Sequence, residues 1–160
     1  MTILVSIDPG IRACGVAGFE DRVLKWAEYV QSNYTGADNI KAAVKMSDCV
    51  RMKYCFYFVD HVISEVPVMR KGSPVPPADI MHLYGVVAAI GSTQLDFETV
   101  QPSTWKGTVP KKIFLERILK CLTDEERQRL PKLPASKLHN VIDAVGIGLW
   151  KLGRLNAKGK

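Results

Sequence analysis

Several features that define other protein classes are missing from these 160 residues. No stretch approaches the roughly 20 consecutive apolar residues of a membrane span, although 47% of the residues are hydrophobic. The N-terminal apolar run is too short for a secretory signal and lacks a basic start. We therefore expect an intracellular, cytoplasmic protein that forms one domain over residues 1–160 and has no membrane partner.

Potential zinc ligands are also scarce. The chain has four cysteines and three histidines, no Cys-x-x-Cys pair, and no spacing between cysteine and histidine that is typical of a zinc site. We expect reduced and mostly buried thiols. No internal repeat or low-complexity segment is present, which agrees with a single globular unit.

Charge is distributed unevenly along the chain. Residues 1–103 carry a net charge of −2 and residues 104–160 a net charge of +8. The basic part includes a Lys- and Gly-containing tail over about 151–160 and three lysines around a predicted turn and helix start, Lys106, Lys111 and Lys112. Such a surface suits a polyanion such as nucleic acid. The alternative is an ordinary solvated face.

Hydrophobic periodicity predicts an α/β protein with a central five-stranded sheet flanked by helices. The predicted strands are 2–8, 15–20, 22–30, 61–68 and 97–101. The predicted helices are 39–58, 78–90, 110–122 and 136–150. The first three strands follow one another closely enough to form an antiparallel meander.

Local signals predict where several helices start. Asp38 or Asn39 is expected to cap the first long helix, and Ser136 the last. Thr123 to Glu126 has the pattern of a capping box for a short helical turn. The Pro- and Gly-rich segment 70–77 is expected to be a loop and a candidate flap.

Three isolated acids interrupt apolar elements. Asp8 ends the first strand, Glu65 lies in the strand predicted over 61–68, and Asp143 lies in the last helix. A carboxylate in an apolar element loses hydration and needs a cation, a polar partner or a proton. Together the three acids are candidates for one metal site.

Two further side chains join this hypothesis through helix geometry. His139 and Asn140 lie four and three residues before Asp143, so all three residues are near one face of the helix. They are candidates to orient a water molecule or to bind a metal weakly. The alternative for His139 is a packed or surface histidine.

Each acid also has an ordinary structural interpretation. Asp8 could cap the turn at Pro9-Gly10, and Glu65 could be a surface residue of an edge strand. Asp143 could pair with Lys151 or Arg154 on the helix surface. Three separate coincidences would be needed for all three interpretations to hold.

The motifs occur in an order that resembles the RuvC-type Holliday junction resolvases of the RNase H-like superfamily. The segments that carry the resemblance are Ile7–Ile11 with Gly15, Ile63–Glu65, Pro102 followed by Trp105-Lys106, and Ile142–Ile147. They span most of the chain. The resemblance implies an RNase H-like fold with a mixed sheet.

The resemblance also implies a function. By it, the protein would be a Mg²⁺-dependent endonuclease that nicks four-way DNA junctions symmetrically, as a homodimer. Asp8, Glu65 and Asp143 would bind two Mg²⁺ ions per site, with Mn²⁺ able to substitute, and would support hydrolysis of a phosphodiester. Lys106 would lie near the scissile strand, and Lys111 or Lys112 would contact DNA.

The chain departs from the family pattern at two places. The position three residues before the last aspartate is usually an acid or a histidine, but here it is Asn140, with His139 one residue earlier. An aromatic wedge usually follows the glutamate, whereas this chain has Val66–Met69. Stacking or contact at the junction would then fall to Met69, or to Arg70 and Lys71, or would not occur at all.

Two alternative functions use the same residues differently. An RNase H-like nuclease for hybrids, flaps or replication forks would share the metal site. A non-catalytic junction-binding protein would use the basic surface without needing three unpaired acids. The helix around His82–Val87 is a candidate dimer interface, or else it simply covers the sheet.

Overall fold

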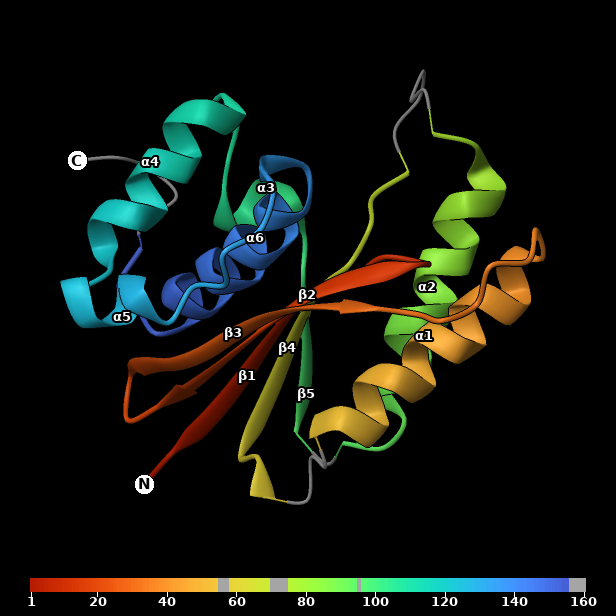
Figure 1. Ribbon diagram of the computed structural model, residues 1–160, viewed down its shortest axis with the longest axis horizontal. Helices are drawn as coiled ribbons and strands as arrows, with labels where there is room; N and C mark the ends of the chain where they lie inside the picture. Colours follow the sequence, from red (N-terminus) through yellow and green to blue (C-terminus); the bar gives the residue numbers. More distant parts are fainter. Residues whose placement is uncertain (55–57, 70–74, 95, 156–160) are drawn as a thin grey trace.

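A computed structural model describes residues 1–54, 58–69, 75–94 and 96–155, which form one five-stranded sheet with helices on both faces (Figure 1). The strands are β1 (Ile3–Asp8), β2 (Ala13–Glu20), β3 (Val23–Gln31), β4 (His61–Glu65) and β5 (Phe97–Val100). The helices are α1 (Asn39–Tyr54), α2 (Pro77–Gly91), α3 (Pro102–Trp105), α4 (Lys111–Cys121), α5 (Asp124–Gln128) and α6 (Ala135–Lys151). No helix in the described ranges is long and apolar enough to cross a membrane.

The sheet has the order β3-β2-β1-β4-β5 and is mixed. β1, β2 and β3 form the predicted antiparallel meander, whereas β4 is parallel to β1 and β5 is parallel to β4. Asp21 and Arg22 both have positive φ, 45° and 72°, as a two-residue hairpin turn requires. β1 is central, and this position explains why its interior is buried on both faces.

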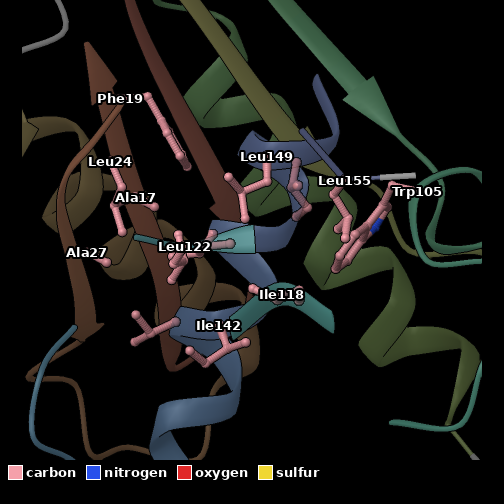
Figure 2. Packing of buried hydrophobic residues seen from close by; sticks show 14 of the residues in the cluster. Ala17, Phe19, Leu24, Ala27, Trp105, Ile118, Leu122, Ile142, Leu149 and Leu155 are labelled. Atoms are coloured by element: carbon pink, nitrogen blue, oxygen red, sulfur yellow. The ribbon is translucent and has the colours of Figure 1, made fainter. Parts of the chain in front are cut away.

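Side-chain alternation divides the core into two layers. Leu4 of β1 packs in the cluster that contains α6, whereas Val5 and Ile7 pack in the cluster on the side of α1 and α2. Figure 2 shows Phe19 and Leu24 from the meander in the same cluster as Leu149 of α6. Even-numbered positions of β1 therefore face α6, and Asp8 is one of them.

α6 is seated very closely on the sheet. A Cβ atom at Gly15 would lie 1.9 Å from the backbone oxygen of Asn140, so only glycine fits there. One helical turn further on, the buried hydroxyl of Ser6 donates a hydrogen bond of 2.7 Å to the backbone oxygen of Ala144. These two contacts fix the register of α6 against β1 and β2.

Most predicted elements are confirmed, with corrections at their ends. The predicted strand 61–68 ends at Glu65, and the predicted helix 39–58 ends at Tyr54, just before residues 55–57, which lie outside the described ranges. α3 was not predicted, because four residues are too few to show a helical period. The flap predicted at 70–77 falls largely on 70–74, also outside the described ranges.

The predicted caps have different outcomes. Asp38 Oδ1 accepts hydrogen bonds from the backbone N–H groups of Ile40 and Lys41, so Asp38 caps α1. Thr123 forms the predicted capping box at α5. Ser136 is not the cap of α6, because the helix already begins at Ala135 and Pro134 takes the N-cap position. The N-cap therefore lies two residues before the predicted one, at Pro134, whose backbone is extended, and the helix starts at Ala135 and not at Ser136.

A buried ion pair ties the chain beyond α6 to the rest of the fold. The Glu126 side chain is 2% exposed and accepts hydrogen bonds from Arg154 Nη1 at 2.6 Å and Nη2 at 2.7 Å. It also accepts from the backbone N–H groups of Thr123 and Leu24. Burial alone would raise the pKa of Glu126, but these hydrogen bonds outweigh it and lower the pKa to about 2.

This pair predicts acid sensitivity. Glu126→Gln should lower the free energy of unfolding at pH 7 by about 3 kcal/mol, because it leaves Arg154 buried without its counter-charge. The folded pKa near 2 lies below the ordinary value of 4.5, so the stabilisation is present above pH 4.5 and is lost as the pH falls towards 2. Urea denaturation between pH 7 and pH 3 measures both effects. Glu125→Gln, at an exposed neighbouring position, is the control, and equal losses in the two variants would contradict the prediction.

Candidate active site

Two of the three predicted acids end adjacent strands. Asp8 is the last residue of β1 and Glu65 is the last residue of β4, and the parallel register pairs Ile7 with Ser64 immediately before them. Both acids belong to the face of the sheet that α6 covers, by alternation from Leu4 and Ile63 in the α6 cluster. Both carboxylates therefore lie at the C-terminal ends of β1 and β4, on the face of the sheet that α6 covers.

The third acid comes from α6, and a lysine joins it to the strands. Lys106 Nζ lies 3.4 Å from Glu65 Oε2 and 3.8 Å from Asp143 Oδ2. The side chains of Glu65 and Asp143 are 15% and 18% exposed, so this is a sheltered cluster with access to solvent. The structure thus brings together the acids that the sequence predicted, and it adds Lys106 between them.

The ordinary interpretations of these acids do not hold. β4 lies between β1 and β5, so Glu65 is not on an edge strand. Asp143 does not pair with the two predicted surface cations, because Lys151 binds Glu98 and Arg154 binds Glu126. The nearest cation to Asp143 among the described residues is Lys106.

Asp8 is the acid whose surroundings most disfavour the charged form. Burial raises its pKa well above the ordinary value, and the neighbouring charges of Asp143 and Glu65 raise it further. Lys106 and Lys111 act in the opposite direction. The Asp8 carboxylate accepts no hydrogen bond from a described residue, so it does not cap the turn that follows β1.

Glu65 is held more firmly than Asp8. Burial raises its pKa, while Lys106 and a hydrogen bond from the Trp105 indole oppose the rise. The Trp105 Nε1–H group donates to Glu65 Oε2 at 2.7 Å. In the sequence, Trp105 is recognisable only as part of a family motif, because a tryptophan in a chain gives no sign that its N–H group points at a carboxylate.

A cleft of about 440 Å³ opens beside the acid cluster. Asp143, Lys106 and Lys111 supply its charged lining, and Val68, Val109 and Phe114 supply its main apolar lining. Gly107, which also lines it, has a φ of 64° and lets the chain turn sharply after Lys106. A cleft whose lining includes two lysines, next to a cluster of acids that could bind a cation, suits a phosphate-bearing ligand.

The other predicted site residues have more varied positions. His139 and Asn140 are half-buried on α6, one turn before Asp143, and neither side chain makes a hydrogen bond or ion pair with a described residue. Lys112 is exposed in the first turn of α4, and Met69 is 57% exposed. Arg70 and Lys71 lie outside the described residues.

The carboxylate oxygens of Asp8, Glu65 and Asp143 are suitable ligands for a hard divalent cation, although they are not arranged around a common point. Carboxylate oxygens are the ligands that Mg²⁺ prefers, and Asp8 has no competing hydrogen bond within the described part of the chain. No three His, Cys, Asp or Glu side chains of the described residues are grouped closely enough to hold one ion together. Instead the ammonium group of Lys106 supplies positive charge between Glu65 and Asp143.

Comparison with known proteins identifies the fold. No family model matches the sequence, and a search of curated proteins found no match. Among solved structures, Thermus thermophilus RuvC in complex with a Holliday junction substrate is similar over 98% of this chain and 99% of its own, with a TM-score of 0.64 and 15% identity. The fold is that of RuvC.

Two further structures agree with this assignment. A second structure of Thermus thermophilus RuvC gives a TM-score of 0.57 at 14% identity, over 97% of this chain and 99% of its own. The yeast mitochondrial Holliday junction resolvase Ydc2 gives 0.57 at 11% identity, over 94% and 79%. The predicted five-stranded mixed sheet flanked by helices is confirmed, and its fold matches that of the RuvC structures.

The crowding of negative charge predicts a stabilising substitution. Asp8→Asn should raise the free energy of unfolding by about 1–2 kcal/mol at pH 7 in the presence of a chelator, because it removes a poorly solvated charge beside two others. Urea denaturation checks this. Asp124→Asn, at a side chain that is 91% exposed, is the control and should change stability by at most about 0.5 kcal/mol. Destabilisation by Asp8→Asn would mean that Asp8 has a structural role at the turn.

Proposed function

We propose that this protein is a divalent-metal-dependent endonuclease that nicks four-way DNA junctions. The observation that carries the proposal is the meeting of Asp8, Glu65 and Asp143 from β1, β4 and α6 beside a cleft lined by Asp143, Lys106 and Lys111. Two proteins of similar fold support the choice of substrate. RuvC was solved in complex with a Holliday junction substrate, and Ydc2 is a Holliday junction resolvase.

The three carboxylates would hold Mg²⁺, with Asp8 shared between two ions and Mn²⁺ able to substitute. When bound, such ions activate a water molecule and stabilise the leaving oxygen of a phosphodiester. Asp8, with its unpaired carboxylate, is available to more than one ion. His139 or Asn140, one turn earlier on α6, would orient the attacking water.

The basic residues would bind the DNA backbone. Lys106 and Lys111 line the cleft, and Lys112 lies beside Lys111 at the start of α4. Met69 follows β4 with its side chain largely exposed, where it can contact bases at the centre of a junction. Arg70 and Lys71 extend the same segment. Phosphate contacts of this kind supply most of the affinity for DNA and weaken as salt rises.

A homodimer would give two sites for symmetric cutting. α2 uses one face to cover the sheet, through Val86 and Ile90, and its opposite face is exposed at Met81 and Tyr84, which are 67% and 45% exposed. Gly85, with no atom within 4 Å of an added Cβ, lies on the exposed face and permits close approach of a second helix. We place the dimer interface there.

The proposal predicts separate effects on cutting and binding. Asp8→Asn, Glu65→Gln and Asp143→Asn should each abolish nicking of a synthetic four-way junction in Mg²⁺ or Mn²⁺, because each removes a metal ligand. Binding of the junction, measured by fluorescence anisotropy, should stay within about threefold of the original protein, since phosphate contacts come from lysines. Glu125→Gln is the matched control and should cut normally.

The choice of DNA substrates decides between the alternatives. Nick positions are mapped on a four-way junction, a replication fork, an RNA–DNA hybrid and a linear duplex. Paired nicks confined to the junction support the proposal. Equal cutting of forks or hybrids would favour a broader RNase H-like nuclease, and junction binding without any nicking would favour a non-catalytic binding protein.

The dimer proposal predicts a monomeric variant. Met81→Glu should shift the protein from dimer to monomer in sedimentation experiments, because it places a charge in an apolar interface. The variant should still nick one strand but lose the paired cuts. Val23→Glu, at a 41% exposed position on the meander, is the control and should remain dimeric. A monomeric unmodified protein would contradict this assignment.

A further inference from the structure

The Trp105 side chain combines complete burial with a polar contact to the acid cluster. Trp105 is the last residue of α3 and is 0% exposed. Its ring packs edge-on against Phe114 of α4, with centroids 5.1 Å apart at 67°. Its Nε1–H group donates to Glu65 Oε2 at 2.7 Å, a short bond of the kind that charged acceptors form. The indole is thus held by apolar packing and aimed at a carboxylate.

Packing around the ring leaves the indole little freedom. A Cβ atom at Gly146 of α6 would lie 2.7 Å from the Trp105 ring, so the helix backbone closes against the ring. Lys106 Nζ lies 4.8 Å from the ring centroid, within the range of a cation–π contact. The N–H group of Trp105 therefore has a fixed direction that is set by α4 and α6.

This fixed donor divides the two oxygens of Glu65 into different roles. Oε2 accepts the Trp105 hydrogen bond and lies 3.4 Å from Lys106. Oε1 has no hydrogen bond from a described residue and is free to bind a cation. A neutral donor orients the carboxylate without cancelling its charge, as the second-layer partners of metal-binding carboxylates do in proteins.

We propose that Trp105 is a positioning residue that orients Glu65 to receive a divalent cation through its indole N–H group. The inference rests on the proposed function, because it assumes that Glu65 is a metal ligand. A positioning role and a purely structural role of Trp105 predict different effects of replacement by phenylalanine. Phenylalanine would replace the ring in the core but would leave Glu65 without its donor.

Metal affinity without DNA tests this directly. Binding of Mn²⁺ to the full chain is measured by isothermal titration calorimetry for the original protein, Trp105→Phe and Trp150→Phe. Trp105→Phe should bind Mn²⁺ about 10- to 100-fold more weakly, the usual effect of losing a partner of a metal ligand. Trp150 is half-buried on α6, and its indole N–H group makes no hydrogen bond to a described residue. It is the matched control and should bind as the original does.

A spectroscopic measurement on the unmodified sequence keeps the test independent of folding of the variant. The three indole N–H signals are resolved by NMR after ¹⁵N labelling of tryptophan, and those of Trp26 and Trp150 are assigned by Trp26→Phe and Trp150→Phe. The Trp105 signal should move when Mg²⁺ is added and should broaden first with Mn²⁺. It should also move in Glu65→Gln. A Trp105 signal that responds to none of these would overturn the inference.

The outcomes separate this inference from the proposed function. If the original protein binds no Mn²⁺, the proposed function fails and the inference fails with it. If Asp8→Asn abolishes Mn²⁺ binding while Trp105→Phe binds within twofold of the original, the metal site stands and Trp105 only fills the core. Weaker Mn²⁺ binding in Trp105→Phe but not in Trp150→Phe, together with a Trp105 indole signal that responds to the metal, supports the inference.

Discussion

The close seating of α6 on β1 and β2 is the constraint on which the rest of the structure depends. Gly15 has no side chain that would push the helix away, and the Ser6 hydroxyl fixes the register of the helix at Ala144. Asp143 is the residue just before Ala144. A shift of α6 by one turn would carry Asp143 about 5 Å along the helix axis and break the acid cluster. Core packing and site geometry are therefore set by the same contacts.

The negative charges of the acid cluster repel one another and are electrostatically unfavourable for the folded protein. Burial and the two neighbouring carboxylates of Asp143 and Glu65 raise the pKa of Asp8, and Lys106 and Lys111 offset only part of that effect. The Glu126–Arg154 pair shows the opposite arrangement, with every polar atom of the carboxylate matched and its pKa lowered. A buried acid used for stability is saturated with donors, whereas the acids of the candidate site are left partly unmatched and available to a ligand.

Much of this arrangement could be predicted from the sequence, and the reasons differ by element. Short apolar runs separated by short connections made β1, β2 and β3 predictable, and isolated acids in apolar segments marked Asp8, Glu65 and Asp143. The four residues of α3 are too short to give a periodic signal. The start of α6 was misplaced because Ser136 is a common cap, yet Pro134 already sets the required backbone. The direction of the Trp105 N–H group depends on tertiary packing and has no local signature.

The acid cluster draws its members from β1 and from α6, which are more than 120 residues apart along the chain. During synthesis, a polypeptide that has emerged only as far as α5 possesses Asp8 and Glu65 but lacks Asp143. It also lacks the helix whose backbone closes against Trp105. Any hydrolytic capacity of this site must therefore be absent from partial translation products and arise only once α6 has docked.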